Sequence, residues 1–301
     1  MKDIIIIGAG TAGMTAGIYG ARAGKKVLII EKLVCGGQIV NSPEVENYPG
    51  IEKVSGYDFA YRLYEQAESC GVEFAYETVT GIEDHEDYKL VICEDKKYKS
   101  KAVIIATGAK NRPLGLEREK EFTGSGISYC ATCDGAFYKD KITAVVGAGN
   151  TAVDDAIYLS DICKKVYLIH RRETFRAEKT KIKVLSENDN VEIVLNSRIT
   201  ALNGTERLTA ITIEDNEKNT RKIDLDGLFV AIGQMPDSEA FSSVVDTDVS
   251  GYIIAGEECT TNVRGIFTAG DCRTKKLRQL TTAASDGAIA ATLACEYIDK
   301  N

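Results

Sequence analysis

Two cysteines three positions apart, followed directly by an acid, are the residues of this chain whose spacing most clearly suggests chemistry. They are Cys130, Cys133 and Asp134, in the stretch SYCATCDGAFY. Such a pair can be half of a metal site, a structural disulfide, or a redox centre in which one thiol attacks a partner disulfide and the other resolves the mixed disulfide. An acid beside the pair can carry the proton that thiol and thiolate exchange.

The rest of the sequence favours the third of these interpretations. A zinc site needs two further ligands, but the chain has only two histidines and no second pair of cysteines at this spacing. A disulfide across two intervening residues closes almost no loop, so it constrains the unfolded chain very little. We therefore favour a redox centre and predict no metal, and a structural or incidental pair stays open as the alternative.

The overall composition describes an acidic protein of a reducing compartment. The 301 residues include 45 acidic and 37 basic ones, a net charge of −8 that argues against nucleic acid or an anionic membrane as a partner. The nine cysteines are odd in number and scattered, as in proteins whose thiols stay reduced. The first apolar stretch, DIIIIGAG, is too short for a signal peptide or a membrane span, so we expect a cytoplasmic location.

A glycine-rich turn near the N-terminus predicts a dinucleotide site. A strand at 3–7 leads into GAGTAG, a helix of small residues, and a second strand that ends at Glu31. Gly8 allows a tight turn, Gly10 lets the backbone approach a diphosphate, and Gly13 lets helix and strand pack closely. Glu31 stands 23 positions after Gly8, where a ribose hydroxyl needs an acceptor. This pattern predicts a cofactor with an unphosphorylated ribose. The alternative is a glycine-rich turn with only a structural role.

The same order of elements returns in the middle of the chain. A strand at 142–146 leads into GAGNTA, then a helix within VDDAIYLSDI and a strand within KKVYLIH. Gly147 begins this turn, and Ala152 takes the place of the third glycine, a variation that the dinucleotide motif tolerates. The repeat predicts a second dinucleotide site.

Basic residues occupy the position that an acid holds in the first repeat. His170 stands 23 positions after Gly147, followed by Arg171 and Arg172, with Arg176 close behind. Guanidinium groups bind a ribose 2′-phosphate, whereas a carboxylate repels one. The second site should therefore prefer NADPH over NADH, and an ordinary solvated basic face is the alternative.

Two further segments fit a pair of nucleotide sites. KAVIIATGA (101–109) and RGIFTAGD (264–271) are apolar strands that end in Thr or Ala followed by Gly, and they flank the second repeat. The second leads to Asp271, which could bind a chain of sugar hydroxyls. With an unphosphorylated adenine cofactor at one turn and a phosphorylated one at the other, the pattern suggests FAD and NADPH in separate domains.

The expected fold class is α/β, with two Rossmann-like, three-layer ββα dinucleotide-binding domains. The NADPH domain is inserted into the FAD domain. We predict a discontinuous FAD domain at 1–112 and 240–301, and an NADPH domain with the cysteine pair at 113–239. The crossings at 110–115 and 233–240 each contain one of only four prolines, which marks them as candidate linkers or hinges.

The motifs GAGTAG, CGGQI, EVENYPG, ATGA, CATCD, HRRETFRA, TAGD and RQLTTAASDGAIAA resemble, in order and over nearly the whole chain, the low-molecular-weight thioredoxin reductases. These are flavoproteins of the pyridine nucleotide-disulfide oxidoreductase family. The resemblance implies a homodimer that passes hydride from NADPH to FAD, then to a Cys130–Cys133 disulfide, and finally reduces thioredoxin by dithiol exchange. It also implies that Cys133 faces the flavin, that Cys130 forms the mixed disulfide, and that Asp134 is the catalytic acid.

The motifs and the resemblance together assign residues to each cofactor. Those expected to bind FAD are Gly8, Gly10, Thr11, Ala12, Gly13, Glu31, Gly36, Gly37, Gln38, Asn47, Thr107, Gly108, Asp271, Arg278 and Gln279. Those expected to bind NADPH are Gly147, Gly149, Asn150, Thr151, Ala152, His170, Arg171, Arg172 and Arg176. Two other thiols, Cys35 and Cys272, would lie near the flavin, and we expect both to be inert and buried.

Domain reorientation and partner choice complete the expectations. Because the disulfide and the nicotinamide site belong to one domain and must both reach one flavin, the inserted domain is expected to change orientation during turnover.

Other functions stay open. The chain could reduce a different dithiol carrier, or take electrons from ferredoxin, or hold FAD as a redox sensor without turnover.

Overall fold

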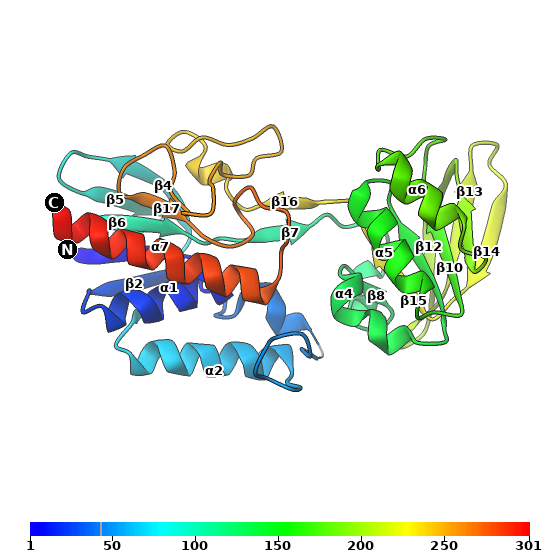
Figure 1. The fold of residues 1–301 in the computed structure, drawn as a ribbon, viewed down its shortest axis with the longest axis horizontal. Helices are drawn as coiled ribbons and strands as arrows, with labels where there is room; N and C mark the ends of the chain where they lie inside the picture. The colour runs from blue at the N-terminus through cyan, green and yellow to red at the C-terminus, as the bar shows by residue number, and fades with distance from the viewer. Residues whose placement is uncertain (43) are drawn as a thin grey trace. The chain divides into compact units, whose positions relative to one another are not determined.

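The chain divides into two units, each built on its own sheet. The computed structural model describes residues 1–42 and 44–301. One unit comprises Met1–Lys110 and Met235–Asn301, and the other comprises Asn111–Gln234. The chain leaves the first unit through β7 (Ala109–Asn111) and returns through β16 (Gln234–Pro236), and these two strands pair as a short ribbon (Figure 1).

A seven-stranded sheet forms the centre of the first unit. Its order is β3-β2-β1-β6-β5-β4, with β17 also paired to β6. The C-terminal half of β6 pairs with β17 and its N-terminal half with β5, so one long strand joins a parallel region to an antiparallel hairpin. The strands are β1 (Lys2–Ile7), β2 (Val27–Glu31), β3 (Glu73–Tyr76), β4 (Val79–Asp84), β5 (Lys89–Cys93), β6 (Lys97–Ile105) and β17 (Ile266–Thr268).

Three α-helices accompany this sheet, and α1 contacts both of the others (Figure 1). They are α1 (Thr11–Arg22), α2 (Gly56–Ser69) and α7 (Leu280–Lys300), with 3₁₀ turns η1 (Gly37–Asn41) and η3 (Glu239–Phe241). A β-carbon on Gly287 of α7 would lie 2.2 Å from the carbonyl oxygen of Ala12. The close packing of α7 on α1 therefore requires a glycine at this position.

The run of four isoleucines in β1 is buried on both faces of the sheet. Ile4 and Ile6 belong to the cluster that includes residues of α1 and α7, whereas Ile5 and Ile7 join a second cluster with Phe241. Side chains of a strand alternate between faces, so a continuous apolar run is what a parallel strand covered on both sides requires. The sequence DIIII therefore specifies a central strand.

The second unit has two sheets and a layer of helices. A parallel sheet in the order β11-β10-β9-β15-β8 lies in its centre, beside an antiparallel sheet in the order β12-β13-β14. The strands are β8 (Ile127–Ser128), β9 (Ile142–Val146), β10 (Lys165–Ile169), β11 (Val191–Val194), β12 (Ser197–Gly204), β13 (Leu208–Asp215), β14 (Thr220–Asp224) and β15 (Gly227–Val230). The helices are α3 (Glu119–Phe122), α4 (Ala131–Asp134), η2 (Gly135–Tyr138), α5 (Asn150–Ser160) and α6 (Lys179–Ser186).

Two apolar clusters hold these layers together. One joins the parallel sheet to the antiparallel sheet, with Ile169 and Ile211 among its members, and the other joins the parallel sheet to α5 through Val145 and Val153. This is the three-layer ββα arrangement expected from the sequence. Helix α5 begins at Asn150, earlier than the expected stretch VDDAIYLSDI, because the glycine turn leads straight into its first residue. Within residues 1–42 and 44–301, no helix has the length and apolar character needed to cross a membrane.

A buried ion cluster connects α7 to the loop after β17. Asp286, of which 4% is exposed, accepts hydrogen bonds from the Gly270 N–H (2.9 Å), the Arg273 guanidinium (2.7 and 2.8 Å) and Lys275 Nζ (2.8 Å). Burial alone would raise the pKa of Asp286, but these partners outweigh it and the pKa is lowered. The stabilisation is therefore present above the unfolded pKa of about 3.9 and is lost as the pH falls through the folded value.

Replacing Asp286 by Asn should strongly destabilise the first unit, because Arg273 and Lys275 would be left buried without a counter-charge. We expect the free energy of unfolding to fall by about 3–5 kcal/mol, measured by urea unfolding at equal cofactor saturation. Asp299→Asn is the control, since this acid of the same helix pairs with Lys25 at the surface and its side chain is 65% exposed. That change should cost less than about 1 kcal/mol. Equal losses in the two variants would contradict the role of burial.

Candidate functional site

The first glycine turn leaves a helix N-terminus free. A β-carbon on Gly8, where φ is +105°, would lie 2.5 Å from the carbonyl oxygen of Ala106, and one on Gly13 would lie 1.9 Å from the carbonyl oxygen of Gly8. At Gly10, by contrast, no described residue beyond its chain neighbours comes within 4 Å of a β-carbon. Helix α1 begins at Thr11, and no side chain caps its first N–H groups. The open side of this turn can accept an anion such as a diphosphate.

Glu31 is held in a fixed orientation beside this turn. It ends β2, its Oε2 accepts the Ala9 N–H (2.8 Å), and its Oε1 accepts the Leu33 N–H (3.0 Å). A cleft of about 450 Å³ opens next to it, and Gly8 and Thr107 are also among its lining residues. Each carboxylate oxygen retains a lone pair, so Glu31 can still accept a bond from a ribose hydroxyl in this cleft.

Five buried polar side-chain atoms of the first unit have no hydrogen-bond partner among the described residues, and three of them belong to residues that the sequence assigns to FAD. These three are Asp271 Oδ1, Thr107 Oγ1 and Arg278 Nε. Burial raises the pKa of Asp271, although Lys275 and Arg278 oppose the shift. Leaving such an atom unpaired costs about 1–3 kcal/mol. A ligand with sugar hydroxyls and phosphate oxygens would satisfy these atoms, so the residues fit a flavin dinucleotide.

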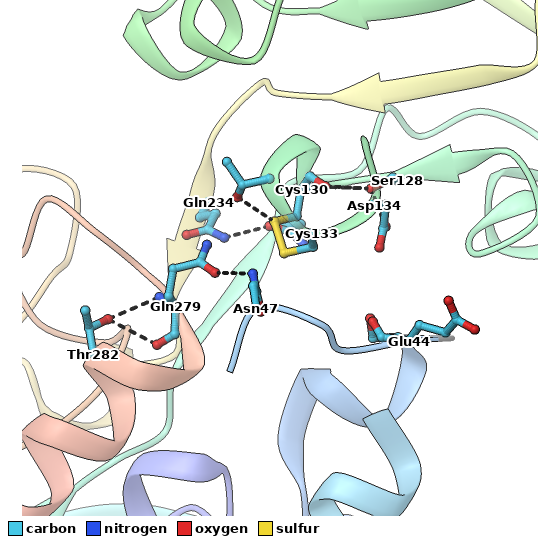
Figure 2. The surroundings of a disulfide bond; sticks show 12 residues. Glu44, Asn47, Ser128, Cys130, Cys133, Asp134, Gln234, Gln279 and Thr282 are labelled. Carbon is cyan, nitrogen blue, oxygen red and sulfur yellow. Dashed lines mark hydrogen bonds between the residues drawn. A yellow bond between two sulfur atoms is a disulfide. The ribbon is translucent and has the colours of Figure 1, made fainter. Parts of the chain in front are cut away.

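The second glycine pair and the start of α7 complete the first site. Gly36 and Gly37 both have positive φ, and the Gly36 N–H donates to the Ala9 carbonyl (2.7 Å), which places η1 against the first turn. Asn47 Nδ2 donates to Gln279 Oε1 (3.2 Å), although the two residues are 232 positions apart, and Gln279 caps α7 through Thr282 (Figure 2). Gln38 follows Gly37 as the second residue of η1, and Gly108 has a φ of +71° directly after Thr107.

The second turn repeats this geometry in the other unit. A β-carbon on Gly147 would lie 2.4 Å from the Ala231 carbonyl oxygen and 2.6 Å from the Ala152 β-carbon, whereas the position of Gly149 is open among the described residues. Helix α5 begins at Asn150, followed by Thr151, without a side-chain cap. This N-terminus too can accept an anion.

The loop of arginines is fastened to the second turn. Asn150 Oδ1 accepts the Glu178 N–H (2.9 Å), Asn150 Nδ2 donates to Glu178 Oε1 (3.2 Å), and the Arg176 N–H donates to the Ala148 carbonyl (2.8 Å). These bonds close the segment that follows β10 over the GAGN turn. The hydrogen bond from its backbone N–H therefore holds Arg176 next to the second dinucleotide turn.

The three arginines of this loop are exposed and unpaired. In the part of the chain that the structure describes, no carboxylate forms an ion pair with Arg171, Arg172 or Arg176. His170 is buried instead, with its ring stacked at 5.9 Å on Phe175, and burial together with the field of the three arginines lowers its pKa. A surface with unneutralised guanidinium groups fits a phosphate ligand.

The cysteine pair forms a disulfide at the start of α4. The Cα atoms of Cys130 and Cys133 are 5.3 Å apart, and Cys133 is the more exposed of the two. A β-carbon on Gly135, just after α4, would lie 2.7 Å from the Tyr158 ring, so a glycine lets the redox turn pack directly on α5. The disulfide and the second dinucleotide turn are thus both fixed to one helix of the same unit.

Asp134 directly follows the second cysteine and is half-buried, with its Oδ1 atom fully buried. Its Oδ2 accepts a hydrogen bond from the Ser128 hydroxyl (2.6 Å), and its Oδ1 is buried without a partner among the described residues (Figure 2). Burial raises the pKa of Asp134, and the bond from Ser128 opposes that rise. A carboxyl group with a raised pKa accepts a proton more readily than an exposed aspartate, which suits an acid that exchanges a proton with a thiol.

The predicted site residues therefore fall into two sets. Those assigned to FAD all lie in the unit of Met1–Lys110 and Met235–Asn301, and those assigned to NADPH lie with the cysteine pair in Asn111–Gln234. Cys272 is fully buried and burial raises its pKa, as expected for an inert thiol. Cys35 is only half-buried, with Sγ 3.6 Å from the Tyr76 hydroxyl.

Two buried polar residues near the cysteine pair in the sequence, Ser128 of β8 and Glu119 of α3, are not predicted from the sequence. Ser128 bonds to Asp134, and Glu119 accepts the Tyr129 hydroxyl (2.8 Å) and the backbone N–H groups of Leu114 (2.7 Å) and Gly115 (2.8 Å). Glu119 is 4% exposed. Neither residue belongs to a recognisable motif, because a buried acid or hydroxyl is defined by what surrounds it in space.

Comparison with known proteins agrees with this geometry. Residues 2–287 match the model of the pyridine nucleotide-disulphide oxidoreductase family. A thioredoxin reductase of Listeria innocua is 41% identical over 300 residues, which cover 99% of this chain and 94% of that protein, and one of Bacillus subtilis is 41% identical over 305 residues, which cover 99% and 95%. The crystal structure of a Streptococcus pyogenes thioredoxin reductase is 42% identical, with a TM-score of 0.95 over 100% of this chain and 99% of that chain.

These matches span nearly the whole chain, cover the positions of both dinucleotide turns and of the cysteine pair, and confirm the α/β fold class and the resemblance seen in the motifs. The family uses a flavin and a nicotinamide cofactor, in agreement with the two turns. The chain belongs to the pyridine nucleotide-disulphide oxidoreductase family, among its thioredoxin reductases.

Proposed function

We propose that this protein is an NADPH-dependent thioredoxin-disulfide reductase with FAD as its flavin. One observation carries the proposal: the Cys130–Cys133 disulfide lies beside the buried carboxyl of Asp134, in a unit that also has a dinucleotide turn and unpaired arginines. Relatives that are named thioredoxin reductase and are 41% identical over nearly the full length support thioredoxin as the partner.

The two cofactors would bind in separate domains. We propose FAD for the domain of 1–112 and 240–301, where the open turn at Gly10, the oriented Glu31 and Asp271 Oδ1, which has no partner among the described residues, fit its diphosphate and hydroxyl groups. We propose NADPH for the domain of 113–239, where the unpaired arginines suit a 2′-phosphate. When bound, the flavin accepts a hydride from the nicotinamide and supplies two electrons to a disulfide.

The cysteines then exchange those electrons with thioredoxin. Two electrons break the Cys130–Cys133 bond, and one of the two resulting thiolates takes a proton from Asp134. The Cys130 thiolate attacks one sulfur of the thioredoxin disulfide, which forms a mixed disulfide and releases a thioredoxin thiolate. Cys133, as a thiolate, attacks the Cys130 sulfur, restores the original disulfide and releases the second thioredoxin thiolate. The two thiolates of the reduced thioredoxin take up protons from the solvent.

The protons of this cycle would pass through Asp134. Because burial raises its pKa, the protonated form is populated closer to neutral pH than in an exposed aspartate. Asp134 can therefore protonate a thiolate when the disulfide opens and take the proton back before Cys130 attacks thioredoxin.

Turnover would require the inserted domain to change its orientation. The ribbon of β7 and β16 is held by the Arg112 N–H to the Gly233 carbonyl (3.0 Å) and by Gln234 Nε2 to Asn111 Oδ1 (2.8 Å). Gly233 has a φ of +104°, and Gly108 before the ribbon has a φ of +71°. Two glycines that need positive φ next to a short ribbon support the crossings at 110–115 and 233–240 as hinges.

We further propose a homodimer in the cytoplasm. Tyr57 and Tyr61 of α2 stack at 6.2 Å and are 63% and 49% exposed, an aromatic surface that an identical subunit could cover. Seven free cysteines suit a reducing compartment.

Replacing Cys133 by Ser should separate the two halves of the reaction. We expect NADPH to reduce the flavin as in the wild type, because that step does not use the disulfide, whereas thioredoxin reduction falls below about one thousandth of the wild-type rate. Anaerobic flavin absorbance and thioredoxin-coupled NADPH oxidation measure the two steps. Cys70→Ser, at a half-buried free thiol, is the control and should keep both activities. Loss of flavin reduction in Cys133→Ser would contradict the proposed order of electron flow, and a wild-type protein that ignores thioredoxin would overturn the proposed partner.

The arginine loop should decide the choice of nicotinamide cofactor. In the double variant Arg171→Ala and Arg172→Ala, we expect the KM for NADPH to rise at least about 100-fold, since charge-assisted hydrogen bonds contribute about 1.5–3 kcal/mol each. The KM for NADH should change by less than about twofold, because NADH has no 2′-phosphate. Arg198→Ala is the control, since this exposed arginine of the same unit pairs with Glu214 at 2.8 Å. Equal effects on NADPH and NADH would contradict the assignment.

A further inference from the structure

The structure assigns Ser128 a positioning role in the chemistry of the cysteine pair. We propose that its hydroxyl occupies Oδ2 of Asp134 as a hydrogen-bond donor and thereby directs the proton that Asp134 carries onto Oδ1. The inference rests on the proposed function, in which Asp134 exchanges a proton with the thiols of Cys130 and Cys133.

Ser128 has one hydrogen and two possible acceptors. It is the last residue of β8 and is 5% exposed. The Cys130 N–H donates to Ser128 Oγ (3.1 Å), and the hydroxyl can donate either to Asp134 Oδ2 (2.6 Å) or to the Cys130 carbonyl (3.3 Å) (Figure 2). A bond to an ionised acceptor is shorter and stronger than one to a neutral carbonyl. The hydroxyl hydrogen therefore belongs to Oδ2 when Asp134 is ionised.

This assignment makes the two oxygens of Asp134 unequal. Oδ2 already accepts a hydrogen, whereas Oδ1 is buried and has no partner among the described residues. A proton that arrives on Oδ1 keeps the bond from Ser128, but a proton on Oδ2 forces the hydroxyl to turn to the more distant Cys130 carbonyl. Protonation at Oδ1 therefore keeps the stronger bond, and the proton is held on the oxygen that no other group of the described chain engages.

The bond also links the acid to the first redox cysteine. Ser128 accepts from the backbone of Cys130 and donates to Asp134, so a single buried hydroxyl ties both residues to β8. When Asp134 gives its proton to a thiolate, the bond from Ser128 stabilises the carboxylate that remains. When a thiol returns the proton, the same bond persists. The hydrogen bonds of Ser128 are therefore the same in both protonation states of Asp134.

The titration of Asp134 must be distinguished from that of other ionisable groups on the neighbouring elements. On η2, Tyr138 lies in the field of Asp134, Arg207 and Asp226. On α5, which packs on α4, burial and the charge of Asp154 raise the pKa of Asp155 to about 7. Asp154 itself pairs with Lys181 at 2.7 Å, and α5 also carries Tyr158. Asp155 is the group that could be confused with Asp134 in a pH titration, so the experiment uses an Asp155→Asn background.

Ser128→Ala tests the proposal. In the oxidised holoenzyme, the carboxyl carbon of Asp134 is titrated by NMR and assigned by its absence in Asp134→Asn. Removing the donor to the carboxylate should raise the pKa of Asp134 by about one unit, and the midpoint of the pH profile for reduction of a purified bacterial thioredoxin by the pre-reduced enzyme should shift equally. Flavin reduction by NADPH should not change. Ser128→Thr, which keeps the hydroxyl, should restore both values.

A matched control separates positioning from packing. Ser160 is 9% exposed, lies in the same unit, and donates to the Ile157 carbonyl (2.6 Å) while it accepts from Asn188 (2.8 Å). Ser160→Ala should therefore lose comparable bonds without moving the titration of Asp134. An unchanged titration and pH profile in a folded Ser128→Ala would overturn the proposal, as would an equal shift in Ser160→Ala. If Ser128→Ala does not fold, Ser128→Cys is titrated instead, and an unshifted midpoint there counts against the proposal.

The outcomes also distinguish this inference from the proposed function. If Asp134→Asn reduces thioredoxin at the wild-type rate at every pH, then the role of Asp134 itself is wrong, and Ser128 has nothing to position. If Asp134→Asn is slow but Ser128→Ala behaves as the wild type, the role of Asp134 stands and the role of Ser128 fails.

Discussion

Backbone atoms at both dinucleotide turns approach one another more closely than a side chain would permit. A β-carbon on Gly13 would lie 1.9 Å from the carbonyl oxygen of Gly8, and one on Gly147 would lie 2.4 Å from that of Ala231. This contact lets α1 and α5 begin directly at the carboxyl ends of central strands, with their first N–H groups free. The positions of Glu31 and of the arginine loop depend on this close approach, because both are hydrogen-bonded to the turns.

Helix α5 links the nucleotide site of the second unit to its redox pair. Its N-terminus forms the turn, and its side supports the segment after the disulfide, where Gly135 lies against Tyr158. The unit thus holds the proposed source of electrons and their exit on one rigid element. In the first unit, the buried cluster around Asp286 similarly fixes the loop that leads from Asp271 to α7.

Local sequence was enough to predict the features that repeat or alternate. The isoleucines of β1 follow from the pattern within one strand. Both glycine turns, the acid at the end of β2 and the arginines after β10 follow from spacing within one strand-helix-strand unit. The sequence favours a redox centre at the cysteine pair, because a metal site lacks further ligands and a structural disulfide has almost no loop to close. Ser128, Glu119 and Asp286 were missed, since each acts through partners that only folding brings into contact.

The sequence by itself determined the class of chemistry: two dinucleotide turns of opposite charge preference and one redox pair with an acid. These motifs depend on residue types at short, fixed spacings, so they can be recognised without knowledge of the fold. Only the tertiary structure decided how the acid is tuned and how distant residues meet, such as Asn47 with Gln279. Burial raises the pKa of Asp134, and its Oδ1 has no hydrogen-bond partner within residues 1–42 and 44–301. Burial is a property of the packed layers around a residue rather than of its neighbours in sequence.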